Sequence, residues 1–275
     1  MTYPQIEFQT FMHGRPRTCG VVLDIRDTVR APERAEIGAL CARSMHNPAA
    51  TASGKIALLA ADGIHVFQAD ARQSVRRVWC GNAVAAALAV EASAAARLEV
   101  HGPAGRRCTV ESRCSGPSIQ QTWTFEGSPR IIDREWRGLR VAIVGFLNRY
   151  AIVEGPLPDG VTPSEARLEL VGASLDAKLA VVDPGRTDVV SFHNAAGEHG
   201  AAPLTGLATL GLARLRCSWL AMLLARGSIR HLEGGRRHTQ ALPRILTSPQ
   251  GCLRIVMPGL EVALNVPGAE WEMAA

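Results

Sequence analysis

The chain has 275 residues, 47% of them hydrophobic and 20% charged, which is typical of one large globular domain or two smaller ones. Its net charge is +5, but the arginines are scattered and only 5% of residues are aromatic, which argues against a nucleic-acid-binding protein. No apolar run is long enough to cross a membrane, and the first residues lack the features of a signal peptide. We therefore expect a cytoplasmic protein with no membrane partner, whose surplus positive charge suits a small anionic substrate.

Cysteine and lysine usage narrows the chemistry. Seven cysteines are scattered with neither CxxC spacing nor paired histidines, so we expect neither a disulfide framework nor a structural zinc site. Only two of the 30 basic residues are lysine, Lys55 and Lys178. Since lysine can lose its proton and arginine cannot, a lysine kept in so arginine-rich a chain is a candidate base.

Two patterns of strand and helix follow one another along the chain. Residues 52–63 (ASGKIALLAADG) predict a strand that ends in a turn, and residues 80–92 (CGNAVAAALAVEA) predict a buried helix that is apolar on every face. Residues 175–185 (LDAKLAVVDPG) repeat the strand pattern, and residues 204–216 (LTGLATLGLARLR) repeat the helix pattern. The two lysines are 123 residues apart and the glycines near the two helix starts are 125 apart, which indicates an internal repeat.

The repeat predicts an α+β fold of two pseudo-symmetric halves, residues 1–133 and 134–275. Short β-type runs with glycine and proline turns outnumber the helices, so we expect each half to be a mixed or antiparallel sheet wrapped around one buried central helix. The N-terminal half carries Lys55 and Cys80, and the C-terminal half carries the second central helix. The N-termini of two such helices, with free N–H groups and partial positive charge, can bind a carboxylate-bearing ligand without a metal ion.

Cys80 stands directly before the first helix and is followed by Gly81 and Asn82. One interpretation is a small buried thiol that happens to lie at a helix start. The other is a reactive cysteine, because a helix N-terminus favours the thiolate form and a glycine lets a ligand approach the backbone closely. Cys80 is therefore a candidate catalytic residue.

Five segments resemble, in order along the chain, sequence blocks of the 2-methylaconitate cis-trans isomerase family. That family includes methylitaconate and oxalomesaconate isomerases and shares the diaminopimelate epimerase fold. The five segments are FMHGRPRTCG (11–20), NPAATASGKIAL (47–58), WCGNAVAAAL (79–88), EHGAAPLTGLATLGLA (198–213) and TSPQGCLRIVMPG (247–259).

The resemblance implies proton transfer beside a carboxylate, without a cofactor or metal, that shifts a C=C bond. Lys55 and Cys80 match the positions of the family's lysine and cysteine. Members of the fold that racemise amino acids use a cysteine at each helix start, but the second would fall near Ala202 or Pro203, where this chain has none. The resemblance therefore favours the isomerase over the racemase.

The same resemblance and the helix starts suggest substrate-binding residues: Thr18, Ser53, Gly81, Asn82, His199, Thr205, Gly206 and Ser248. Asn148, Arg15 and Arg17 are further candidates, whereas we interpret Lys178 as structural. Arg15 and Arg17 could equally be ordinary charged residues of the surface.

Three functions stay open at this point. The first is an isomerase of small unsaturated di- or tricarboxylates that acts through Lys55 and Cys80. The second is an amino-acid racemase or epimerase of the same fold. The third is a carboxylate-binding protein that has lost the chemistry, because the RPRTCG and TSPQG blocks depart from the family pattern. Substrate identity and oligomeric state stay open as well, a homodimer included.

Overall fold

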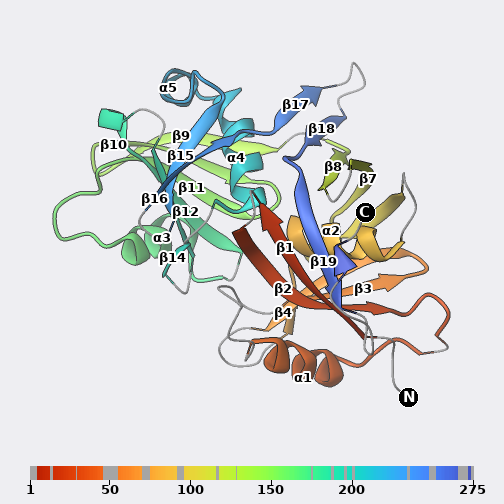
Figure 1. The fold of residues 1–275 in the computed structure, drawn as a ribbon. Coiled ribbons are helices and arrows are strands. Elements are labelled where there is room, and N and C mark those ends of the chain that lie inside the picture. The colour runs from red at the N-terminus through yellow and green to blue at the C-terminus, as the bar shows by residue number, and fades with distance from the viewer. Residues whose placement is uncertain are drawn as a thin grey trace. The chain divides into compact units, whose positions relative to one another are not determined.

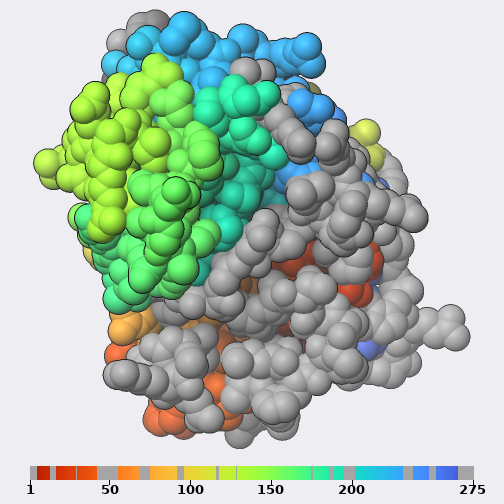
Figure 2. Space-filling model, turned by 90° about the vertical axis from the view of Figure 1, so that its left-hand side faces the viewer, coloured from red at the N-terminus to blue at the C-terminus, as the bar shows by residue number. Residues whose placement is uncertain are grey.

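The computed structural model divides into two compact units, residues 1–126 with 256–275 and residues 127–255, each described here by itself (Figure 1). It describes residues 5–12, 15–28, 30–45, 55–69, 75–91, 96–115, 118–127, 129–174, 176–186, 189–194, 197–199, 202–233, 236–247, 252–265 and 272–273. Figure 2 shows one face, on which described residues of the second unit, in green to blue, form a continuous surface.

The first unit is a closed barrel of eight strands in the order β8-β7-β6-β4-β3-β2-β1-β19. The strands β2 and β3 are parallel, as are β4 and β6, and the other neighbours are antiparallel. Strand β19 pairs with both β1 and β8, which closes the barrel. The bounds are β1 Gln5–Met12, β2 Arg15–Asp24, β3 Lys55–Ala60, β4 Gly63–Ala69, β5 Val75–Arg77, β6 Arg97–His101, β7 Arg107–Ser115, β8 Ser118–Phe125, β19 Leu260–Asn265 and β20 Glu272–Met273.

Helix α2, Gly81–Glu91, lies inside this barrel and contacts β1, β2, β3, β4, β8 and β19. Its residues from Ala83 to Leu88 are at most 3% exposed, as a helix without a polar face requires. Five of those six residues are alanine or valine, and such small side chains suit the narrow interior of an eight-stranded barrel. Helix α1, Arg34–Met45, packs instead on the outside, against β2, β3, β4 and β5.

The second unit contains a six-stranded sheet in the order β14-β13-β12-β11-β10-β9, in which only β11 and β12 pair in parallel among the described strands. Helix α3, Pro163–Val171, covers one face of β11–β13, and helix α4, Leu204–Arg214, contacts β10, β11 and β17 and is buried along its length. The other bounds are β9 Arg130–Trp136, β10 Leu139–Gly145, β11 Arg149–Glu154, β12 Ala177–Val182, β13 Val190–Asn194, β14 Gly197–His199, α5 Ser218–Leu223, β15 Ser228–Glu233, β16 Arg236–Ala241, β17 Arg244–Thr247 and β18 Leu253–Val256. Within the described ranges, no helix is long and apolar enough to span a membrane.

The same order of elements occurs in both units. The first runs β1-β2-α1-β3-β4-β5-α2, and the second runs β10-β11-α3-β12-β13-β14-α4. In each series the strands on either side of the first helix are parallel, and the last helix has 11 residues. These two helices begin at Gly81 and Leu204, which are 123 residues apart in the sequence, the same separation as between the two lysines. The pseudo-twofold relation stays a prediction, to be tested by superposing the two units on α2 and α4.

The division of the chain differs from the predicted halves, 1–133 and 134–275. The break lies at residues 126 and 127, and residues 256–275 return to the first unit. The physical reason is β19, which supplies the strand needed between β1 and β8 to leave the barrel without an open edge. The C-terminal segment therefore does not belong with the second central helix. That helix also ends at Arg214, before the predicted 216.

Candidate active site

Lys55 is the first residue of β3 and faces the inside of the barrel. Its neighbours Ile56 and Leu58 belong to the core cluster formed with α1 on the outer face, so the alternation of a strand turns Lys55 toward the side of α2. It pairs in register with Gly20 of β2 and with Gln68 of β4. The Lys55 amine donates a hydrogen bond to the Oε1 atom of Gln68. The side chain is therefore held in the barrel interior and is only partly exposed.

The surroundings of Lys55 favour its neutral form. Burial lowers the pKa of Lys55, and the charges that Cys80, Cys41 and Cys19 carry as thiolates oppose this change, with Cys80 the strongest of the three. The amine of Lys55 and the sulfur of Cys80 therefore lie within electrostatic range of one another. A lysine that loses its proton more easily than an exposed one can act as a base.

Cys80 occupies the residue position directly before α2. The N–H of Val84 donates to the carbonyl oxygen of Cys80 at 3.1 Å, which makes Cys80 the residue that opens the helix. The thiol is partly exposed. The first turn of α2 contains no acidic residue, so the partial positive charge of this helix end is not neutralised by a side chain of its own. The helix start can therefore stabilise negative charge on a ligand.

Hydrogen bonds fix the first turn of α2 against two strands. Asn82 Nδ2 donates to Thr18 Oγ1 on β2 at 2.6 Å, and Gln121 Nε2 on β8 donates to the carbonyl oxygen of Gly81 at 3.0 Å. Trp123 Nε1 orients this glutamine by donating to Gln121 Oε1 at 2.9 Å. The Oδ1 atom of Asn82 is buried and has no hydrogen-bond partner among the described residues. A buried acceptor without a partner is costly, so this oxygen is a candidate contact for a ligand.

The start of α4 has a related arrangement. Thr205 is the second residue of this helix, as Asn82 is of α2, and its Oγ1 accepts a hydrogen bond from Asn148 Nδ2 at 2.9 Å. Each helix start is therefore tied to its sheet by one Asn–Thr hydrogen bond, with the two residue types exchanged. Gly206 lies against the ring of Phe192 and the hydroxyl group of Tyr150. The first turn of α4 also lacks an acidic residue.

Of the other candidate residues, the structure describes only some. Ser53 and Ser248 lie outside the described residues, as do the side chains of His199 on β14 and Arg15 on β2. Arg17 is buried on β2. The structure thus brings together Lys55, Cys80, Thr18, Gly81 and Asn82 in the first unit, and Thr205, Gly206 and Asn148 in the second. That all of them bind one substrate stays a prediction.

Two solved structures resemble this chain over nearly its whole length. A predicted epimerase from Pseudomonas aeruginosa matches with a TM-score of 0.57 and 13% identity, over 96% of this chain and 97% of that one. A phenazine biosynthesis protein of the PhzF family from Bacillus anthracis matches with a TM-score of 0.57 and 10% identity, over 95% of this chain and 97% of that one. The chain has the diaminopimelate epimerase-like fold.

This likeness confirms the predicted fold type and shows nothing finer, since the identities are so low. No family model matches the chain, and no curated protein matches it. Membership of the 2-methylaconitate cis-trans isomerase family stays a prediction, as does the substrate class.

Two glutamines of the site were not predicted from the sequence. Gln68 accepts the Lys55 hydrogen bond, and Gln121 holds the carbonyl oxygen of Gly81. The hairpin could have identified Gln68, because a two-residue turn after Ala60 pairs Lys55 with Gln68 in antiparallel register. No pattern in the sequence indicated Gln121, because 40 residues separate it from Gly81 and only closure of the barrel brings the two residues together.

Replacement of Gly20 by alanine is expected to disturb this site. A Cβ atom at Gly20 would overlap the carbonyl oxygen of Lys55 and would lie 2.9 Å from the ring of Phe8, so β2 and β3 must move apart. We expect a loss of about 1 to 3 kcal/mol in the free energy of unfolding, measured by urea denaturation. Gly145→Ala is the matched control, because its Cβ atom would meet nothing closer than 4.0 Å. Equal stability of the two variants would contradict the close approach at Gly20.

Proposed function

We propose that this protein is a cofactor-independent isomerase that moves a C=C bond within a small unsaturated di- or tricarboxylate. The observation that carries the proposal is that one barrel holds both a partly buried lysine of lowered pKa and a cysteine at the start of its central helix. The diaminopimelate epimerase-like fold supports an isomerase in general terms. The choice of substrate class rests on the resemblance in sequence and on the positive helix ends.

The proposed reaction uses Lys55 as base and Cys80 as acid. The neutral amine of Lys55 removes a proton from the carbon γ to a carboxylate, and the C–H electrons form the new C=C bond of a dienolate. The electrons of the original double bond shift at the same time towards the carboxylate. The thiol of Cys80 then donates its proton to the α-carbon, and the enolate electrons form the new C–H bond while the carboxylate is restored. The substrate gains and loses one proton, and a return transfer from ammonium to thiolate through solvent restores both groups.

The residues around this pair would supply binding and charge stabilisation. The N–H groups at the start of α2 can donate to a substrate carboxylate, where the dienolate charge develops. The buried Oδ1 atom of Asn82 can accept a hydrogen bond from a protonated or hydroxyl group of the substrate.

One alternative has an observation in its favour, since one of the structural relatives is a predicted epimerase. A racemase or epimerase of amino acids needs an acid and a base on opposite faces of the α-carbon. The residue before α4 is Pro203, which cannot carry a proton, whereas the residue before α2 is Cys80. The chemistry available at the two helix starts is therefore unequal, which supports the isomerase.

Proton exchange in D₂O distinguishes the three functions. The protein is incubated with a panel of unsaturated di- and tricarboxylates and of amino acids, and deuterium incorporation is followed by NMR. We expect exchange at the allylic carbon of an unsaturated carboxylate. Exchange at the α-carbon of an amino acid would replace this proposal with an epimerase, and tight binding without exchange would replace it with a carboxylate-binding protein.

A further inference from the structure

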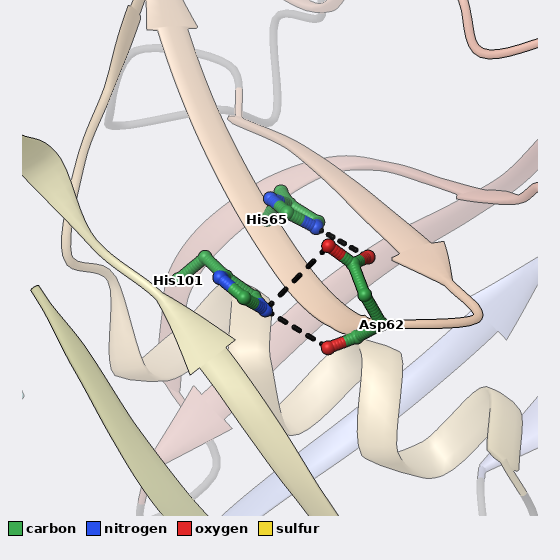
Figure 3. A group of neighbouring side chains, drawn as sticks. All are labelled: Asp62, His65 and His101. Atoms are coloured by element: carbon green, nitrogen blue, oxygen red, sulfur yellow. Dashed lines mark hydrogen bonds and ion pairs between the residues drawn. The ribbon is translucent and has the colours of Figure 1, made fainter. Parts of the chain in front are cut away.

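Asp62, His65 and His101 form a cluster away from Lys55 and Cys80 (Figure 3). Asp62 lies in the two-residue turn between β3 and β4, His65 on β4 and His101 at the end of β6. His65 lies on the same face of β4 as Phe67, which packs on the outer core cluster with α1. The cluster is therefore on the outer side of the barrel wall, opposite to Lys55.

The two histidines present the same nitrogen to Asp62. His65 Nε2 lies 2.8 Å from Asp62 Oδ1, and His101 Nε2 lies 2.8 Å from the Asp62 carbonyl oxygen and 3.7 Å from Oδ2. The two rings stack with centroids 4.4 Å apart and planes inclined by 7°. One donor atom from each residue lies within 4.8 Å of the other two. Figure 3 shows both imidazoles approaching the carboxylate from their separate strands.

The backbone holds this arrangement without help from a ligand. His65 and His101 are direct neighbours in the parallel pairing of β4 and β6. Gly63 follows Asp62 with a φ of +129°, and a Cβ atom there would overlap the carbonyl oxygen of Glu99, so the turn is packed closely against β6. The side chains of His65 and His101 are 12% and 16% exposed, whereas that of Asp62 is 64% exposed. The backbone thus keeps the three residues next to one another, and their donor atoms can be reached from solvent on the Asp62 side.

The chemistry of the donors points to a transition metal. Two imidazole nitrogens and one carboxylate oxygen are ligands that zinc accepts, whereas magnesium and calcium prefer oxygen alone. Tetrahedral zinc with bonds of about 2.0 to 2.2 Å holds its ligands about 3.4 Å apart. Metal binding would replace the hydrogen bonds of both Nε2 atoms to Asp62 and would turn the stacked rings until both nitrogens point at the ion.

We propose that Asp62, His65 and His101 bind one divalent transition-metal ion of the zinc type on the outer wall of the barrel. The carboxylate of Glu99 lies beside the ligands, with its Oε1 atom 3.6 Å from His101 Nε2. Bound metal would link the β3–β4 turn to β6 and so stabilise the two strands that carry Lys55 and Gln68. The sequence did not indicate this site, because the β4–β6 pairing, not a short motif, brings His101 to Asp62 and His65.

Zinc binding by the untagged full-length protein tests the proposal. The protein is treated with a chelator, dialysed and titrated with Zn²⁺ by calorimetry, and native mass spectrometry counts the ions bound per chain. We expect one ion per chain, a melting temperature that rises with Zn²⁺ concentration, and visible absorption bands of tetrahedral Co²⁺ when cobalt replaces zinc. Asp62→Asn and His101→Gln should each weaken binding by at least about tenfold.

Two controls distinguish the loss of the metal site from a general effect of a substitution on the protein. Asp62 is an exposed turn residue, so Asp62→Asn should keep the fold, which circular dichroism verifies. His193→Gln is the matched control, because His193 lies on β13 of the second unit and hydrogen-bonds to Ser191. We expect His193→Gln to bind zinc like the unaltered protein. Absence of one-site binding, or unchanged affinity in Asp62→Asn and His101→Gln, would overturn the proposal.

Discussion

Replacement of Cys80 by serine is expected to lower turnover about 10²- to 10⁴-fold, the range that a positioned proton donor contributes. Serine has nearly the shape of cysteine, so the first turn of α2 and its hydrogen bonds to Thr18 and Gln121 should remain. Its hydroxyl is, however, a far weaker acid than a thiol, even beside the positive end of a helix. The step that fails is protonation of the dienolate, while substrate affinity should change little.

The measurement is kcat on the carboxylate that the D₂O experiment identifies, together with ligand affinity by calorimetry. Cys114→Ser is the control. Cys114 is also a partly exposed thiol of the barrel, on β7, so this variant makes the same chemical change away from the start of α2. We expect this control to keep full turnover. A Cys80→Ser protein that turns over at the unaltered rate would make Cys80 an ordinary core thiol and would remove the acid from the mechanism.

The features that the sequence predicted are those encoded over a few neighbouring residues. The alanine-rich segment after Cys80 is apolar on every side, and such a helix can only be buried, as α2 is inside the barrel. The strand that begins at Lys55 was predicted from its apolar run and the following turn. The order of elements recurs in the second unit, in line with the repeated patterns of sequence.

The features that the sequence did not predict depend on pairing between distant strands. Nothing near Leu260–Asn265 indicates that this segment pairs with β1, more than 240 residues away, and closes the barrel. The hydrogen bond between Thr18 and Asn82 joins residues 64 apart, and the cluster of Asp62 and His101 depends on the register of β4 and β6. Strand pairing over such distances is set by the whole fold, so no local pattern reports it.

Lys55→Arg is expected to lower turnover by about 10²- to 10⁴-fold, like Cys80→Ser but for a different reason. Arginine keeps the positive charge and a long stem, yet it cannot lose its proton and therefore cannot be the base. Because burial lowers the pKa of Lys55, its neutral amine is present at lower pH than that of an exposed lysine. The rising limb of kcat against pH should therefore lie below the ordinary lysine range, around pH 10.4.

The lowered pKa of Lys55 also affects the stability of the protein, and this effect can be measured without a substrate. The folded chain gives up the Lys55 proton at lower pH than the unfolded chain, so the unfolded state binds more protons between the two pKa values. Stability of the unaltered protein relative to Lys55→Met should therefore increase with pH across that window, because the cost of burying the ammonium group disappears. Urea denaturation at a series of pH values measures this difference.

Lys178→Arg is the matched control for Lys55→Arg. Lys178 is on β12, where Ala177 and Leu179 pack on the α3 side, so Lys178 faces away from α3, as Lys55 faces away from α1. The helix of its unit is preceded by Pro203, however, and offers no thiol to complete an acid–base pair. We expect Lys178→Arg to retain most of the turnover and the rise of kcat with pH. If Lys55→Arg kept both properties as well, the base would have to be another group.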